Sequence, residues 1–292
     1  TKKLNQRNSK AIQVPTSVSK YNSIPSKSFW LSVNNNLPFK IPEQFKQFKQ
    51  DTLFITLKSN KSGLEKKDLA FLDLLQANNW ERPIYFNNTS LNGISLDLKR
   101  NVIQEGFAYR LMPVLNPSSG SLINTDLMYY NIMKNSYWRE LDNKDAYFSE
   151  DHRGFIMNYR STFNTLIRKL INENHYEKAF EVIKASIELI PDSSIMYDHF
   201  SVQLVEFLLD LKIKANMDTE ELANEIAEKI GERSDETLNY YYDNNINDKY
   251  EIQKNLVSLN TLARAYSKYN NPDLSKKYRE LFENNYSRNS IN

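Results

Sequence analysis

Amphipathic helical hairpins in the C-terminal half of the chain limit its possible folds more than any other feature. The clearest hairpin spans residues 163–191, where apolar side chains recur every three or four positions and so share one face of a helix. A polar turn at 172–175 interrupts the pattern, and Pro191 ends it. The predicted inward face consists of Phe163, Leu166, Ile167, Leu170, Tyr176, Ala179, Ile183 and Ser186. Such helices cannot bury this face alone, so the pattern requires stacked neighbours.

Two further stretches repeat the arrangement, at 194–230 and from Leu259 onward. The first hairpin fits the frame of about 34 residues of a tetratricopeptide repeat, with the small Ala179 where the helices approach most closely, although its turn has no glycine. Stacks of this kind need roughly three units to be stable. We therefore predict a tetratricopeptide-like helical array over residues 151–292, which offers a surface for holding a partner and no catalytic centre.

Residues 29–115 follow another pattern, in which β-rich runs alternate with helical spacing. The predicted strands are 29–33, 52–57, 83–86 and 107–114, and the predicted helices are 42–50, 64–77 and 96–104. This alternation indicates a small α/β domain with a partly parallel sheet. The fold class expected for the whole chain is α+β, mostly α.

Two segments outside these domains have their own character. Residues 1–28 are polar and basic, and we interpret them as a linker or an extended arm. Residues 116–150 form an aromatic-rich connector, in which Asn124 or Thr125 caps a short helix that runs to about residue 134. Its aromatic residues either join the two domains or form a platform on which carbohydrate stacks.

Several classes of chemistry lack a sequence signature. The chain has no cysteine, six scattered glycines and three histidines without a metal-binding spacing, so no phosphate loop, dinucleotide motif or thiolate site is expected. The run Asp243-x-Asn245-x-Asn247 begins like a calcium loop, but Asp248 and Lys254 replace its glycine and glutamate. We interpret it as a polar loop between helices, and expect neither metal nor cofactor.

Charge and hydropathy exclude further classes. The net charge is only +2, and its positive excess is concentrated in the first twenty residues, in a basic tail with no interleaved aromatic motif. Nucleic-acid binding is therefore not expected. No stretch approaches the roughly 20 apolar residues of a membrane-spanning helix.

An ordered series of motifs carries a family resemblance. It comprises Asn-Trp-Glu-Arg-Pro-Ile-Tyr-Phe at 79–86, Glu-Gly-Phe-Ala-Tyr-Arg-Leu-Met-Pro-Val at 105–114, Ile-Asn-Thr-Asp-Leu-Met-Tyr at 123–129, and Trp138 with Leu-Asp at 141–142. Over residues 50–290 the chain resembles the soluble C-terminal region of a bacterial family of polytopic membrane proteins. That family, long of unknown function, is similar to protein O-mannosyltransferases, which are membrane glycosyltransferases that use lipid-linked sugars.

The resemblance implies that sugar transfer takes place in a membrane-embedded part of the parent protein. This segment would then be a non-catalytic accessory domain on the periplasmic face of the inner membrane. Its implied partners are the membrane-embedded part and an acceptor polypeptide. The basic start of the chain argues against this side of the membrane, because basic residues beside a membrane helix favour the cytoplasm. We prefer the periplasm because the implied substrates are exported.

The motif residues are candidate contacts for a partner or ligand, and each also has a structural interpretation as a core, strand or capping residue. The candidates are Trp80, Arg82, Tyr85, Tyr109, Arg110, Asn124, Asp126, Tyr129, Trp138, Asp142 and Arg160. Two other functions stay open: a stand-alone helical-repeat scaffold that binds a protein, and an independent carbohydrate-active enzyme. Only unpaired carboxylates and aromatic residues favour the enzyme.

Overall fold

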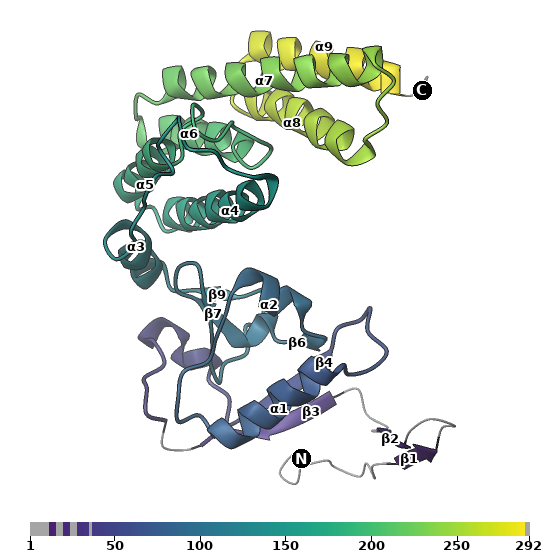
Figure 1. Ribbon diagram of the computed structural model, residues 1–292. Helices are drawn as coiled ribbons and strands as arrows, with labels where there is room; N and C mark the ends of the chain where they lie inside the picture. The colour runs from purple at the N-terminus through teal and green to yellow at the C-terminus, as the bar shows by residue number, and fades with distance from the viewer. Residues whose placement is uncertain (1–11, 16–19, 24–27, 35–36, 290–292) are drawn as a thin grey trace. The chain divides into compact units, whose positions relative to one another are not determined.

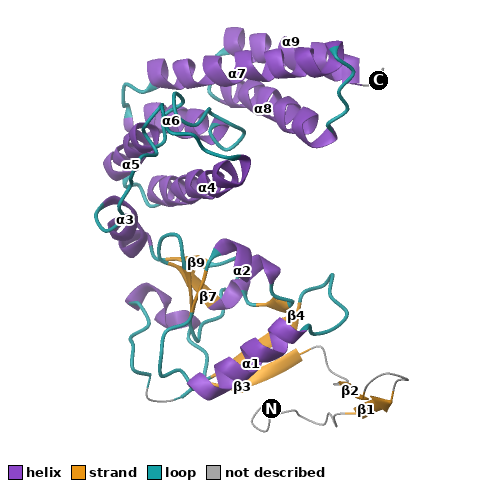
Figure 2. Ribbon diagram, viewed as in Figure 1, coloured by secondary structure: helices purple, strands orange, loops and turns teal. Residues whose placement is uncertain are grey.

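The computed structural model describes residues 12–15, 20–23, 28–34 and 37–289. These residues belong to two compact units, Thr1–Lys134 and Asn135–Asn292. The described strands all lie in the first unit, and the second unit is built from helices (Figures 1 and 2). The predicted fold class, α+β and mostly α, is confirmed.

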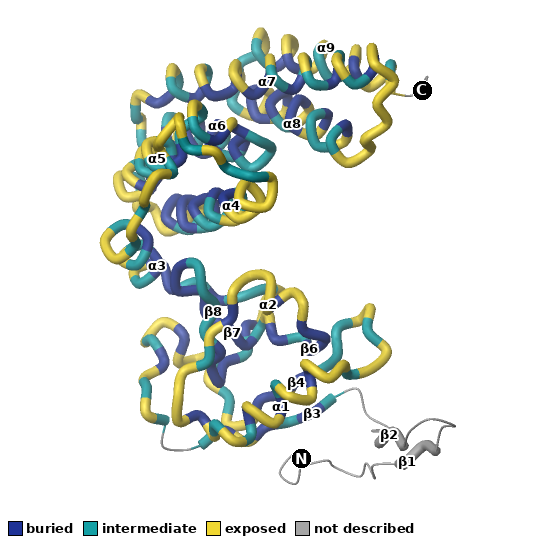
Figure 3. Tube along the Cα trace, viewed as in Figure 1, coloured by how far each residue is buried: buried dark blue, intermediate teal, exposed yellow. Residues whose placement is uncertain are grey.

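A three-stranded antiparallel sheet forms the core of the first unit. Its strands are β3 (Ser28–Ser32), β4 (Thr52–Leu57) and β6 (Leu96–Asp97), in the order β3-β4-β6. Phe29 pairs with Ile55 and Leu31 with Leu53, and all four are buried, because alternate residues of a strand point to the same face. Helix α1 (Lys66–Asn78) adds buried leucines to the same core, and Figure 3 colours the buried positions dark blue.

A second sheet has the order β5-β8-β7-β9. It consists of β5 (Tyr85–Phe86), β8 (Tyr109–Leu111), β7 (Val102–Gln104) and β9 (Leu122–Ile123). The β7–β9 pair is parallel and the other pairs are antiparallel, so the sheet is partly parallel as predicted. A separate hairpin pairs β1 (Ile12–Pro15) with β2 (Lys20–Ser23), within the segment interpreted as an arm.

The predicted helix over 96–104 is wrong. Its ends are the strands β6 and β7, and only the 3-10 turn η2 (Lys99–Asn101) lies between them. The run is short and mostly buried, and periodicity cannot separate a buried strand from a buried helix over such a length. Pairing partners decide the matter, since Leu96 pairs with Leu57 and Val102 with Leu111.

Three short helices complete the first unit. The predicted helix over 42–50 is the 3-10 helix η1 (Glu43–Phe48), and α2 (Asn88–Gly93) follows β5. Helix α3 (Thr125–Met133) begins as predicted, because the Asn124 side chain accepts a hydrogen bond from the Leu127 N–H.

The described helices of the second unit form three hairpins. They pair α4 (Glu150–Asn172) with α5 (Tyr176–Leu189), α6 (Val202–Ala215) with α7 (Glu220–Asp243), and α8 (Lys249–Lys268) with α9 (Pro272–Asn289). The hairpins are confirmed, and the predicted face of the first is buried apart from Tyr176, which is partly exposed. Their tetratricopeptide character stays a prediction.

Asparagine takes the place of glycine at the helix ends. Asn174, Asn216, Asn245 and Asn270 all have positive φ, between 51° and 62°. Asparagine is among the few residues other than glycine that adopt this left-handed conformation readily, so it ends a helix as glycine would. The glycine-free turns are therefore compatible with tight hairpins. Asp243 ends α7, and residues 244–247 form the polar loop between α7 and α8, with Asp248 as the N-cap of α8.

Candidate functional site

Trp80 and Asn124 serve the fold of the first unit. The Trp80 side chain is 6% exposed, and its indole N–H donates a hydrogen bond to the Ser32 carbonyl at 3.3 Å. Asn124 is buried at the start of α3, where it caps the helix. Both side chains already use their polar groups within the fold, which favours the structural interpretation for these two candidates.

Trp138 packs against the first helix of the second unit. Its ring centroid lies 5.3 Å from that of Phe163 and 5.7 Å from that of Tyr159, in an edge-on contact with the latter. Tyr137 and Tyr147, in the same connector, are 89% and 87% exposed. The connector therefore divides into a packed tryptophan and exposed tyrosines.

Arg160 fastens α4 to the segment between α5 and α6. Its side chain is buried, and its guanidinium donates hydrogen bonds to the carbonyls of Met196 at 2.7 Å and Ile195 at 2.5 Å. The Asp198 carboxylate lies 3.5 Å from Nη1, and the guanidinium stands over the Tyr197 ring. A guanidinium so fully engaged has no exposed donor for a ligand.

The remaining candidates outside the strands lie at the surface. Arg82, Asp126 and Asp142 are exposed, and Tyr129 is half-buried on α3. They stay candidate contacts, and the structure adds no geometry that selects among them.

Tyr85, Tyr109 and Arg110 come together on the second sheet. Tyr85 on β5 pairs with Arg110 on β8, and the neighbouring Tyr109 packs against the core. The Arg110 guanidinium lies 4.8 Å from the Phe39 ring centroid and 5.8 Å from that of Tyr85. Glu105, which the sequence did not single out although it opens a quoted motif, lies 3.8 Å from Arg110 and accepts a hydrogen bond from the Tyr85 hydroxyl at 3.2 Å.

Burial determines the electrostatics of this Glu105–Arg110 cluster. The Glu105 side chain is 6% exposed, and its burial raises the pKa of the carboxyl group, although Arg110 and the Tyr85 hydroxyl act in the opposite direction. Arg110 Nε is buried without a hydrogen-bond partner among the described residues. The partly buried Glu105–Arg110 ion pair therefore links β8 to the residue that follows β7, and the Tyr85 hydroxyl adds a contact from β5.

Replacing Glu105 with glutamine is expected to remove a pH-dependent loss of stability. The raised pKa means that the folded chain binds this proton more tightly than the unfolded chain does. Stability of the unmodified chain therefore falls as pH rises from the ordinary glutamate pKa through the raised one, and the loss persists above it. Urea unfolding over a pH series, followed by tryptophan fluorescence, measures the effect.

The glutamine variant should gain stability relative to the unmodified chain across that pH window. The exposed Glu81 supplies the control, Glu81→Gln, in the same unit. A stability difference between Glu105→Gln and the unmodified chain that stays constant with pH would contradict the assignment.

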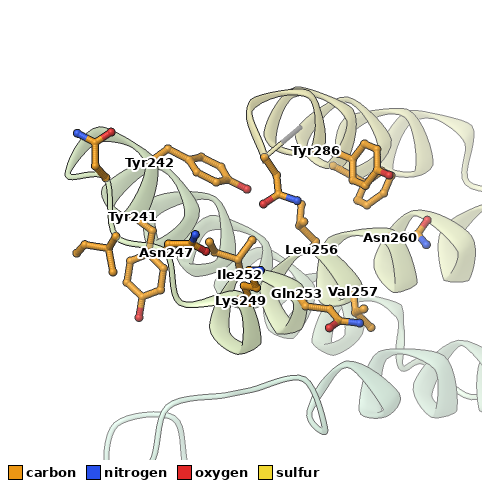
Figure 4. A pocket seen from close by; sticks show the side chains of 14 residues that line it. Tyr241, Tyr242, Asn247, Lys249, Ile252, Gln253, Leu256, Val257, Asn260 and Tyr286 are labelled. Atoms are coloured by element: carbon orange, nitrogen blue, oxygen red, sulfur yellow. The ribbon is translucent and has the colours of Figure 1, made fainter. Parts of the chain in front are cut away.

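A groove in the second unit lies among α7, α8 and α9 (Figure 4). Its volume is about 790 Å³, within the range typical of ligand pockets. Its walls combine amide, aromatic and aliphatic side chains: Asn245, Asn247, Gln253, Asn260, Asn289, Tyr241, Tyr242, Phe282, Tyr286, Ile246, Ile252, Leu256 and Val257, together with Lys249. Sequence reasoning assigned these residues only to helix packing and a polar loop.

The groove is polar but almost uncharged. Lys249 is the one charged residue among the described residues that line it. Two neighbouring cations are paired, Lys254 with Glu251 and Arg288 with Asp243. Five amide side chains provide donors and acceptors without net charge, and this composition suits a neutral polar ligand better than a phosphate or a carboxylate.

Comparison with known families concerns the first unit. Residues 1–132 match TMEM260-associated domain 2. The matched domain ends inside α3, so the groove lies outside it. The match fits a domain linked to a TMEM260-like membrane protein. It therefore agrees with the part of the sequence resemblance that concerns membrane proteins. No curated protein and no solved structure matches the chain. Among the helices of the described residues, none is long and apolar enough to cross a membrane.

Proposed function

We propose that this chain is a non-catalytic accessory part of a membrane glycosyltransferase similar to protein O-mannosyltransferases. It positions an acceptor polypeptide, or the parent enzyme itself, near the lipid-linked sugar. The observation that carries the proposal is the succession of a TMEM260-associated domain and a stack of helical hairpins with an open groove. Helical-repeat stacks present extended surfaces that bind extended chains.

The arrangement of the ionisable residues supports a non-catalytic role. Glu105, the buried carboxylate of the motif series, is engaged by Arg110 and Tyr85. Arg160 is engaged by backbone carbonyls. Both side chains are engaged within the fold, so neither is free to act on a substrate.

The proposed location is the periplasmic face of the inner membrane, as part of a membrane protein. The acceptors that the resemblance implies are exported polypeptides. The name of the matched domain supports the association with a membrane protein.

Titration of the purified chain with unfolded acceptor peptides tests the proposal. We expect saturable binding in the micromolar to millimolar range, because a transferase must release its acceptor after each reaction. Isothermal calorimetry gives the affinity, and circular dichroism confirms that the helices are intact. An intact chain that fails to bind any peptide at millimolar concentration would count against the proposal.

A stand-alone scaffold that binds a protein partner is the second candidate. The observation that favours it is that the groove lies wholly outside residues 1–132. The reading frame upstream of Thr1 separates the two. A frame that continues into many apolar segments supports the accessory role, and a start codon close to Thr1 supports the scaffold.

A further inference from the structure

We infer that the groove among α7, α8 and α9 binds an extended, uncharged stretch of polypeptide through its main chain. This inference rests on the proposed function, because it names the surface that holds the acceptor polypeptide and the chemistry that recognises it. Four observations carry it: the spacing of two amides, the side chains between them, the lack of charge, and a buried hydroxyl.

The two amides lie on one face of α8. Gln253 and Asn260 are both exposed, and both line the groove. Seven residues of helix correspond to two turns and a rise of about 10.5 Å. Three residues of extended chain span about 10 Å, and in a polyproline II chain every third residue faces the same way. The amides are therefore spaced to meet peptide groups three residues apart.

Each amide matches the hydrogen-bonding capacity of a peptide group. A glutamine or asparagine side chain offers one carbonyl acceptor and two N–H donors, so it can accept from a main-chain N–H while it donates to a main-chain carbonyl. Recognition of this kind reads the backbone and is tolerant of side-chain sequence. That tolerance suits a surface that must hold acceptors of varied sequence.

Aliphatic side chains separate the amides. Val257 is 50% exposed and lies one turn from Gln253 along α8, and Figure 4 shows the two side chains next to each other. Ile252 and Leu256 also line the groove but are each only 6% exposed, so Val257 supplies most of the apolar surface. Side chains of a bound peptide would cover this apolar surface. A saccharide would instead bring hydroxyl groups against aliphatic carbon without partners, which is unfavourable. The mixture therefore favours polypeptide over carbohydrate.

Charge complementarity points to an uncharged stretch. Lys249 is the single charged side chain among the described lining residues, and the nearby Lys254 and Arg288 are held by Glu251 and Asp243. A strongly acidic or basic segment would gain no matching partner there. A stretch of small uncharged residues enters the groove without the cost of desolvating an unpaired charge.

Tyr242 adds a donor at the wall of the groove. Its side chain is 7% exposed, and its hydroxyl is buried without a hydrogen-bond partner among the described residues. Figure 4 shows the ring extending from α7 toward α9. A buried hydroxyl without an acceptor is unfavourable. A main-chain carbonyl seated beside it supplies that acceptor.

Binding of a labelled peptide to the full chain tests the inference. The probe is a short peptide of Ala, Pro, Ser and Thr, and its binding is measured by fluorescence anisotropy. The double variant Gln253→Ala and Asn260→Ala should weaken binding about tenfold or more, because two hydrogen-bonding side chains are lost. The double variant Asn158→Ala and Asn284→Ala, at exposed positions outside the groove, is the matched control and should bind as the unmodified chain does.

A second probe isolates the main chain. The same peptide with N-methylated peptide groups keeps its side chains and loses N–H donors, so it should bind markedly more weakly to the unmodified chain. Peptide binding that survives the groove variant, or equal binding of the N-methylated peptide, overturns the inference and leaves the proposed function standing. A neutral oligosaccharide that binds the groove while the peptides do not would overturn both.

Discussion

Replacing Arg160 with alanine is expected to lower the free energy of unfolding of the second unit by about 3–5 kcal/mol. The buried guanidinium donates to the carbonyls of Met196 and Ile195 and pairs with the Asp198 carboxylate. Removal of the side chain leaves the Ile195 carbonyl buried without its donor, which costs about 1–3 kcal/mol, and it breaks the ion pair with Asp198. The segment between α5 and α6 also loses its attachment to α4.

Urea unfolding followed by far-ultraviolet circular dichroism measures this loss, since the second unit contains the long helices. Arg153→Ala is the control, because Arg153 is exposed on the same helix, and its stability should change by less than about 0.5 kcal/mol. Comparing Arg160→Ala with Arg153→Ala also distinguishes a structural role of Arg160 from a role as a contact for a partner. If Arg160→Ala kept its stability and lost only peptide binding, Arg160 would be a contact residue and the structural role would be wrong.

Replacing Gly231 with alanine is expected to destabilise the chain by about 1–2 kcal/mol, against the usual effect of alanine in a helix. A Cβ atom at this position would lie 2.5 Å from Cε1 of Tyr278. The Tyr278 ring is 1% exposed and stacked on Tyr266, with 5.7 Å between ring centroids, so it has little room to move. Overpacking costs about 1–3 kcal/mol and exceeds the gain of up to about 1 kcal/mol from helix propensity.

Replacing Gly154 with alanine is expected to change the stability in the opposite direction. Gly154 lies in the first turns of α4, where a Cβ atom would meet nothing within 4 Å. Helix propensity alone then applies, and alanine should stabilise the chain by about 0.5–1 kcal/mol. Thermal unfolding of the two variants beside the unmodified chain gives both values. Equal stabilisation at the two positions would show that α7 and α9 are not packed as closely as the structure has them.

The helical hairpins were predictable because their signal is local. Positions three and four apart meet on one face of a helix whatever the rest of the chain does, so Phe163, Leu166 and Ile183 were assigned to the core from periodicity alone. The strands at 29–33 and 52–57 were predictable for a similar reason. Residues 96–104 were not, since the pairing of Leu96 with Leu57 depends on a partner about forty residues away.

The roles of the candidate site residues were harder to predict from sequence than the helices, because these roles depend on contacts between distant parts of the chain. The motif series drew attention to Tyr85 and Arg110, but Glu105 acquires its role only through the register that sets β5 against β8. Arg160 looked like a candidate contact, and the carbonyls that engage it come from another part of the chain. The groove has no sequence motif because its residues belong to three helices and to the loop between α7 and α8.

The sequence by itself determined that the C-terminal half forms stacked helical hairpins, because amphipathic periodicity is a property of consecutive residues. It also determined that the motif series continues directly into that stack. Only the tertiary structure decided which polar residues are buried and hydrogen-bonded within the fold and which line an open groove. The physical reason is that burial and hydrogen bonding are set by neighbours in space. Gln253 and Asn260 became candidates, and Arg160 became a structural residue, only when those neighbours were known.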